Sequence, residues 1–387
     1  MRLLFATGEL VVGGRKYPGF PLLIDDDGSA MEPAQSFLWD HLSHGRRQKK
    51  GTWANIGRAL FDFFAYVETN NLDWRTPPCQ GFPSVIDSYR DWSKGEIGLD
   101  PAVINQRLDV IDKFYDWAIR NSLIAQKPFR LERVRVSHPP GFLAHVDASD
   151  GKHESKSSRF REIRRELKFL VLDQVRVCND SLPNETHWLM FQLMVRSGLR
   201  QSECRTFPEK YVFDPAKRRD LLATKHIRVD IDPRDMTIKY DLPRSIDVPC
   251  DLMEELWWYS VRTRAKRERI ERGGTKFPTL FLTEEGRPYG DRALQKIFDL
   301  LSTRVGFHVH PHMLRHTYAT YLLRSLRMSK DFQGDPLLYT RDRLGHADIH
   351  TTARYLHLVN RFESQLIEWH EDELDRLFKS RGEADGG

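Results

Sequence analysis

The chain has 387 residues, which is enough for two or three domains at roughly 150 residues each. Lys and Arg number 60 and Asp and Glu number 55, so the formal net charge of +5 is only mildly basic and its distribution matters more than its total. Four scattered cysteines without paired spacing argue against a disulfide framework or a zinc site, and with no evident signal peptide or bilayer-spanning run we expect a cytoplasmic protein.

The first block of the chain covers residues 1–35. Short β-like runs at 2–5 and 10–12 alternate with turns rich in Gly and Asp. We expect a small arm or extension here, and the pattern assigns it no role.

Residues 36–136 are predicted to be helical. Thr52 is a candidate cap for a helix whose apolar positions, from Ile56 to Val67, recur at helical spacing. Asp100 followed by Pro101 is typical of a helix start, with Asp as the cap and Pro in the first turn. By itself the block indicates a generic helical bundle.

Residues 137–158 are rich in Ser, Pro, Gly, Asp and Lys, a composition typical of a linker before a second domain at 159–387. Basic side chains cluster on both sides of the linker. Such clusters are usually solvated surface, and Lys and Arg side chains are also the groups that contact the phosphates of a nucleic acid. The candidates are Arg46, Arg47, Lys49, Lys50, Arg159, Arg161, Arg164 and Arg165.

The second domain contains an apolar helix followed by Gly198-Leu199-Arg200-Gln201-Ser202-Glu203. Gly198 would let the chain turn after the helix, just before Arg200. Taken alone, this run is equally consistent with an ordinary helix end that carries a surface Arg.

Alternating residues further along predict strands at 227–231, 236–240 and 245–249, with a turn at 232–235. Lys239 ends the middle strand of this predicted hairpin. Lys225 is the other candidate for a functional lysine in this region. Either lysine could instead be an ordinary solvated residue of a strand.

The last informative stretch runs from His312-Met313-Leu314-Arg315-His316 to Leu344-Gly345-His346 and Tyr355. A guanidinium group binds phosphate through paired hydrogen bonds, imidazoles move protons, and a phenol can act as a nucleophile. An inserted polar loop is expected over 324–336, before a helix that starts near Pro336.

These motifs, in this order, resemble the tyrosine recombinase (phage integrase) family over roughly residues 40–365. The resemblance implies a mainly α fold with a small β-sheet (α+β). A helical core-binding domain at 36–136 and a catalytic domain at 159–387 would form a two-domain DNA clamp. It also implies that the amphipathic segment after Tyr355 packs against a neighbouring subunit.

The resemblance further implies a catalytic set of Arg200, Lys239, His312, Arg315, His346 and Tyr355 that uses neither metal nor ATP, with Glu203 and His316 as supporting residues. Tyr355 would form a covalent 3′-phosphotyrosine on double-stranded DNA. The implied partners are a homotetramer on two recombination sites and accessory DNA-bending or partner recombinase proteins.

Several alternatives stay open. Tyr318, Tyr321 and Tyr339 are rival nucleophiles, although only Tyr355 follows Leu-Gly-His. His308, His310, His312 and His316 form a dense group that could suggest a metal, but Arg315 in its midst would repel a cation. A type IB topoisomerase-like enzyme or a catalytically silent DNA-binding regulator of the same fold are the competing functions.

Overall fold

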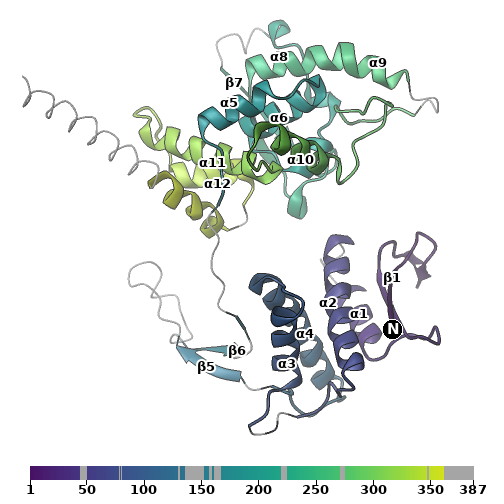
Figure 1. The fold of residues 1–387 in the computed structure, drawn as a ribbon. Coiled ribbons are helices and arrows are strands. Elements are labelled where there is room, and N and C mark those ends of the chain that lie inside the picture. The colour runs from purple at the N-terminus through teal and green to yellow at the C-terminus, as the bar shows by residue number, and fades with distance from the viewer. Residues whose placement is uncertain are drawn as a thin grey trace, which may run out of the picture. The chain divides into compact units, whose positions relative to one another are not determined.

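The computed structural model describes residues 1–43, 50–77, 79, 81–129, 131–135, 152–156, 159–160, 167–218, 225–270, 275–346 and 348–360, with only the backbone at 50, 131–135 and 152–156. The chain divides into two compact units, Met1–Arg164 and Arg165–Gly387 (Figure 1). Helices predominate and the sheets are small, which confirms the predicted mainly α fold.

The first unit is built around the helices α1 (Ala34–Ser43), α2 (Lys50–Thr69), α3 (Val85–Gly95) and α4 (Pro101–Arg120). Asp100 caps α4 as predicted, because its side chain accepts a hydrogen bond from the Ala102 amide and Pro101 occupies the first turn. The predicted cap at Thr52 is wrong, since α2 already includes Lys50.

Aromatic rings fill the core of this unit. Phe114 is fully buried, and its ring meets those of Phe64 and Trp74 edge-on with centroids 5.2 Å apart in each case. Such edge-to-face pairs stabilise beyond the area that they bury.

The N-terminal strands pack onto these helices. β1 (Arg2–Phe5) pairs antiparallel with β4 (Pro21–Ile24), and β2 (Val11–Val12) pairs with β3 (Arg15–Lys16). Phe20 and Leu23 are fully buried in the same hydrophobic core as α2 and α4. Residues 1–35 therefore contribute to the core of the first unit.

Part of the predicted linker has regular structure. β5 (Leu131–Arg135) pairs antiparallel with β6 (Lys152–Lys156), so that Leu131 lies opposite Lys156. Residues 152–156 of the predicted linker thus form a strand that pairs with 131–135.

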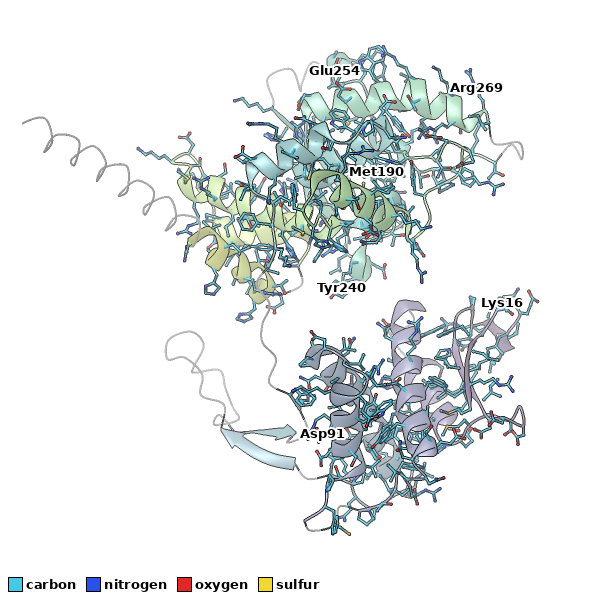
Figure 2. The ribbon with its side chains drawn as sticks, viewed as in Figure 1. Lys16, Asp91, Met190, Tyr240, Glu254 and Arg269 are labelled. Atoms are coloured by element: carbon cyan, nitrogen blue, oxygen red, sulfur yellow. The ribbon has the colours of Figure 1, made fainter. Side chains whose placement is uncertain are left out.

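The second unit has a core of its own. It begins with α5 (Leu172–Asp180), α6 (Glu185–Ser197) and the short α7 (Gln201–Arg205). It continues through α8 (Cys250–Tyr259), a π-helical stretch (Ser260–Arg264) and α9 (Ala265–Glu268), then α10 (Ala293–Val305), α11 (Pro311–Met328) and α12 (Pro336–Leu344). α6 packs against α11, α8 and β8, and its Met190, labelled in Figure 2, is almost completely buried.

The predicted three-strand arrangement before α8 is wrong in its middle member. β7 (His226–Ile231) pairs directly with β8 (Arg244–Pro249), and residues 236–240 form no strand. Met236 and Ile238 are buried, which explains the strand-like alternation. Tyr240 and Asp241 have φ of 69° and 54°, so the chain turns at the 3₁₀ segment Lys239–Asp241 and a ladder cannot continue.

The region before α12 also differs from expectation. α12 begins at Pro336 as predicted, with Asp335 as its cap. The expected polar loop over 324–336 is shorter, because α11 continues to Met328.

No helix of the described residues is long and apolar enough to cross a membrane.

Candidate active site

Arg200 is positioned by the end of one helix and the start of the next. Gly198 ends α6 with φ of 70°, a left-handed conformation that glycine adopts without strain. Arg200 then caps α7, where its backbone N–H and its Nη1 donate to the two carboxylate oxygens of Glu203 at 2.8 and 2.9 Å. Its Nη2 donates to the Gly345 carbonyl at 3.3 Å. Arg200 and Glu203 therefore form a direct ion pair.

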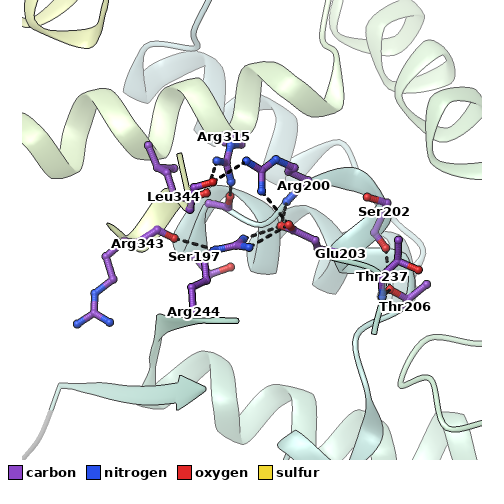
Figure 3. A network of polar contacts seen from close by, with 12 residues as sticks. Ser197, Arg200, Ser202, Glu203, Thr206, Thr237, Arg244, Arg315, Arg343 and Leu344 are labelled. Carbon is purple, nitrogen blue, oxygen red and sulfur yellow. Dashed lines mark hydrogen bonds and ion pairs between the residues drawn. The ribbon is translucent and has the colours of Figure 1, made fainter. Parts of the chain in front are cut away.

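Glu203 also binds a second guanidinium group that sequence reasoning did not assign to the site. Arg244, the first residue of β8, donates from Nη1 and Nη2 to the Glu203 carboxylate at 3.0 and 2.6 Å (Figure 3). Its Nε donates to the Arg343 carbonyl at 3.1 Å. Burial opposes ionisation of Glu203, but its bonds to Arg244 and the charges of Arg244 and Arg200 outweigh burial and lower its pKa to about 2.

Arg315 lies on α11 and is 1% exposed. Its Nη1 donates to the Gly198 carbonyl at 2.7 Å, and its Nη2 donates to the Leu344 carbonyl (Figure 3). Burial and the nearby charge of Arg200 both lower the pKa of Arg315. Glu203 pairs with Arg200 and Arg244, whereas Arg315 binds backbone carbonyls and feels the Glu203 charge only at a distance. These described residues carry three positive charges and one negative charge, an excess that favours an anion.

Tyr355 lies in the helical segment 349–360 and is 2% exposed. Its ring packs with Ala319, Leu323, Leu344 and Val359 in a small apolar cluster. Burial raises the pKa of Tyr355, whereas the charges of Arg315, Arg354 and Arg200 act in the opposite direction. The predicted Tyr and both predicted Arg are therefore brought within electrostatic reach of one another.

Two histidines contact Tyr355 in different ways. Nδ1 of His316 lies 2.9 Å from the Tyr355 Oη, within hydrogen-bond distance. The His346 ring is nearly parallel to the Tyr355 ring, with 7° between planes and centroids 6.2 Å apart. His346 Nδ1 is 2.9 Å from Thr352 Oγ1, which orients the imidazole. Burial and nearby Arg charges lower the pKa of His346 to about 3.

His312 lies within electrostatic reach of Arg200, Arg315 and Lys239. The His312 side chain is exposed to solvent, and surrounding protein together with the charges of Arg315, Arg200 and Lys239 lowers its pKa. Because the His312 side chain is exposed, we attribute the lowered pKa mainly to repulsion by these cations and less to burial. Lys239 is exposed, with its Nζ 5.0 Å from the centre of the Tyr240 ring. Tyr240 is labelled in Figure 2.

Some contributing residues carry no signal that one sequence reveals. Arg244 looks like an ordinary turn residue until β8 places it against Glu203. Asp247 accepts a hydrogen bond from the Tyr339 hydroxyl at 3.1 Å and forms an ion pair with Arg343 at 2.8 Å, and these contacts join β8 to α12. The hydroxyl of Tyr339, one of the rival nucleophiles, is thus engaged in a hydrogen bond that connects two elements of the fold.

A cleft of about 310 Å³ opens beside the site. His346 and Gly345 line it together with Arg228, Arg244, Arg341 and Arg343. A cleft with this lining suits a polyanion such as a nucleic acid backbone.

Most of the predicted DNA-binding side chains cannot be placed. Arg46, Arg47, Lys49, Arg161, Arg164 and Arg165 lie outside the described residues, as do the side chain of Lys50 and the amphipathic segment beyond residue 360. Arg159 is described and binds the Asp109 carboxylate in the first unit. Among described residues, no group of three or more His, Cys, Asp or Glu is arranged to hold a metal ion.

Comparison with known proteins agrees with the geometry. The phage integrase family model matches residues 169–361, about half of the chain. Transposase A from transposon Tn554 of Staphylococcus aureus is 25% identical over 364 residues, which cover 90% of this chain and 93% of that protein. Tyrosine recombinase XerC of Proteus mirabilis is 25% identical over 267 residues, which cover 67% and 69%.

Solved structures show the same fold. The XerH site-specific recombinase bound to palindromic difH substrate matches with a TM-score of 0.54 and 16% identity, over 83% of this chain and 80% of that one. The Tn1549 transposon integrase in complex with a circular intermediate DNA matches with a TM-score of 0.54 and 15% identity, over 83% and 92%. The family model and the sequence relatives identify an enzyme that breaks and rejoins DNA strands. The chain belongs to the tyrosine recombinase (phage integrase) family.

Proposed function

We propose that this protein is a site-specific recombinase that cleaves and rejoins double-stranded DNA through a covalent 3′-phosphotyrosine on Tyr355. The observation that carries this proposal is the convergence of Arg200 and Arg315 on Tyr355, with both guanidinium groups held by protein acceptors and with Glu203 between Arg200 and Arg244. Relatives whose names describe recombinases and a transposase support it.

Arg200 and Arg315 would bind the scissile phosphate. In the transition state the phosphorus carries additional negative charge, and guanidinium groups that are already fixed stabilise it without rearrangement. Their own bonds to Glu203 and to the Gly198 carbonyl set their orientation before DNA arrives. Glu203 thus acts as a positioning residue.

Attack by Tyr355 forms the bond between Oη and phosphorus and breaks the bond between phosphorus and the 5′ oxygen. The phenol proton must leave, and we assign a histidine of α11 to receive it or to orient the phenol, with His312 as the residue expected from the motif. Lys239 would give a proton to the departing 5′ oxygen, and His346 would donate a hydrogen bond to a non-bridging oxygen. A 5′ hydroxyl of a new strand then reverses the same steps.

Recombination in this scheme uses four protomers on two DNA sites. Tyr355 is buried in the free protein, so DNA binding has to expose its Oη before attack. This burial would prevent a single protomer from cleaving DNA before all four protomers have assembled on the two sites.

The proposal is tested with nicked duplexes taken from the DNA that flanks the gene. Purified protein is incubated with them in EDTA, and a denaturing gel detects protein-linked strands. We expect a 3′-linked adduct with the natural chain and none with Tyr355→Phe, because only the phenol oxygen can form the ester.

Tyr339→Phe is the matched control, since Tyr339 is a rival tyrosine whose hydroxyl binds Asp247. It should keep the adduct. An adduct that survives in Tyr355→Phe and disappears in Tyr339→Phe would reject the assignment. Tight binding of these duplexes without any adduct would favour the DNA-binding regulator.

A further inference from the structure

The contact between His316 and Tyr355 bears on how the nucleophile loses its proton. His316 follows Arg315 on α11, and its Nδ1 is 2.9 Å from the Tyr355 Oη. Since a phenol hydroxyl donates and an unprotonated ring nitrogen accepts, this contact fits the tautomer that carries its hydrogen on Nε2. The tyrosine proton already points at a base in this arrangement.

His312 lies one step further from the phenol. Its ring packs edge-on against the His316 ring, with centroids 4.4 Å apart and planes at 66°. The cations that act on His312 include Lys239 and Arg200, which is one of the two residues proposed to bind the phosphate. His312 is therefore placed to meet the phosphate or the lysine, with His316 between it and Tyr355.

His346 is oriented for another task. Its ring stacks parallel to the Tyr355 ring, and its Nδ1 is engaged by Thr352 Oγ1. The ring planes are nearly parallel with centroids 6.2 Å apart, and Nδ1 of His346 meets Thr352 instead of the Tyr355 hydroxyl. The geometry therefore favours His316 over both other histidines as the partner of the Tyr355 hydroxyl.

Burial first, and then the neighbouring charges, lower the pKa of His316 to about 3, so the imidazole is unprotonated at neutral pH. The same shift makes it a weak base while no DNA is bound. A base is improved when its conjugate acid is formed beside a developing anion, which the phosphate would provide. The titratable and charged groups around it are His310, His312, Arg315, His346, Arg354 and Tyr355.

We propose that His316 is a catalytic residue that accepts the phenol proton of Tyr355 as its Oη attacks the scissile phosphate. This inference rests on the proposed function. The proton moves from Oη to Nδ1 while the Oη–P bond forms and the bond from phosphorus to the 5′ oxygen breaks. In the rejoining step His316 returns the proton to the phenol.

The test is the single-turnover rate of adduct formation on the nicked duplexes, measured from about pH 6 to about pH 9. His316→Ala should slow cleavage by about 10²–10⁴-fold, the usual contribution of a general base, with DNA affinity unchanged. Its remaining rate should rise about tenfold per pH unit, because the phenolate must now form by itself.

A more acidic nucleophile separates proton transfer from a structural effect. Difluorotyrosine at position 355 should restore much of the rate of His316→Ala, because this phenol ionises more readily. His316→Asn guards against misfolding: its amide oxygen can accept the phenol hydrogen bond but cannot take the proton, so it should share the defect. His308→Ala is the matched control, an exposed histidine that precedes α11, and should cleave normally.

Three results would overturn the inference. His316→Asn could cleave at the natural rate, His316→Ala could cleave faster because the contact only holds Tyr355 in place, or difluorotyrosine could give no rescue. Each requires that the unaltered protein forms the adduct. Absence of that adduct, or its persistence in Tyr355→Phe, contradicts the proposed function itself and is thereby distinguished.

Discussion

Glu203 is the residue on which the arrangement of the arginines depends. Its two oxygens accept four hydrogen bonds, from the backbone and Nη1 of Arg200 and from Nη1 and Nη2 of Arg244. Its side chain has no exposed surface. The buried carboxylate of Glu203 is stabilised by the guanidinium groups of Arg200 and Arg244 together. In turn, the ionised carboxylate holds both guanidinium groups in their orientation.

We expect the stability of the protein to decrease in acid through Glu203. Its pKa falls from an ordinary 4.5 to about 2 on folding, so its ionisation stabilises the folded state above about pH 4.5. That contribution is lost as the pH drops from about 4.5 through about 2, and is on the order of 3 kcal/mol. Urea unfolding at a series of pH values measures it.

Glu203→Gln should remove this part of the pH dependence and weaken the fold by about 3 kcal/mol at neutral pH, since it leaves buried guanidinium groups without their counter-charge. It should also reduce the adduct yield while Tyr355 is intact. Asp342→Asn serves as the control, because Asp342 forms an exposed pair with Arg341. Equal acid sensitivity in Glu203→Gln and the natural chain would contradict the role of this carboxylate.

At the scale of elements, the turn between α6 and α7 holds the two Arg residues together. Gly198 supplies the carbonyl that Arg315 binds. Its left-handed conformation ends α6 two residues before Arg200, which caps α7. A Cβ added at Gly198 would clash with the Tyr318 ring, which belongs to α11. Tyr318 is thus a packing residue of the site, and this packing gives no support to it as a nucleophile.

Gly198→Ala should therefore destabilise the protein by several kcal/mol and impair cleavage, because the turn is strained and Tyr318 must move. Thermal unfolding and the adduct assay measure both effects. Gly306→Ala is a matched control: Gly306 ends α10 with a similar φ of 77° and has nothing within 4 Å of its Cβ position. It should cost about 1 kcal/mol and leave cleavage intact. An equal loss of activity in both variants would show that the close contact is irrelevant.

The elements also show which features a sequence can predict. The cap at Asp100 and the start of α12 at Pro336 follow from local chemistry, and both are confirmed. The strand predicted at 236–240 failed because its alternation records burial of Met236 and Ile238, whereas pairing depends on which strand β7 meets in space. Arg244 was missed for the same reason, since its contact with Glu203 spans 41 positions of the sequence.

For the whole molecule, the described residues form separate cores. Phe114 belongs to the aromatic core of the first unit, and the largest core of the second unit gathers around α6, β7, β8 and α8. The order of the motifs around Arg200, Arg315 and Tyr355 identified the family without any knowledge of these cores. Each of these motifs is short and can be recognised from residues that are close together in the sequence. The domain limits and the residues that contact DNA remain predictions.

Phe114→Ala should weaken the first unit by about 3–5 kcal/mol, the usual cost of emptying an aromatic core position. In calorimetry we expect the transition of the first unit to shift down and that of the second to move much less. Phe82→Ala is the control, because Phe82 is 75% exposed. A shift of the whole unfolding profile as one transition would contradict two separately cooperative cores.

The most direct test of the account locates the covalent bond itself. After reaction with a nicked duplex in EDTA, the adduct is digested with protease and nuclease and the nucleotide-bearing peptide is sequenced by mass spectrometry. We predict a single modified peptide with the phosphate on Tyr355, joined to the 3′ end of the cleaved strand. A phosphate on Tyr318, Tyr321 or Tyr339, or a linkage to the 5′ end, would contradict the account.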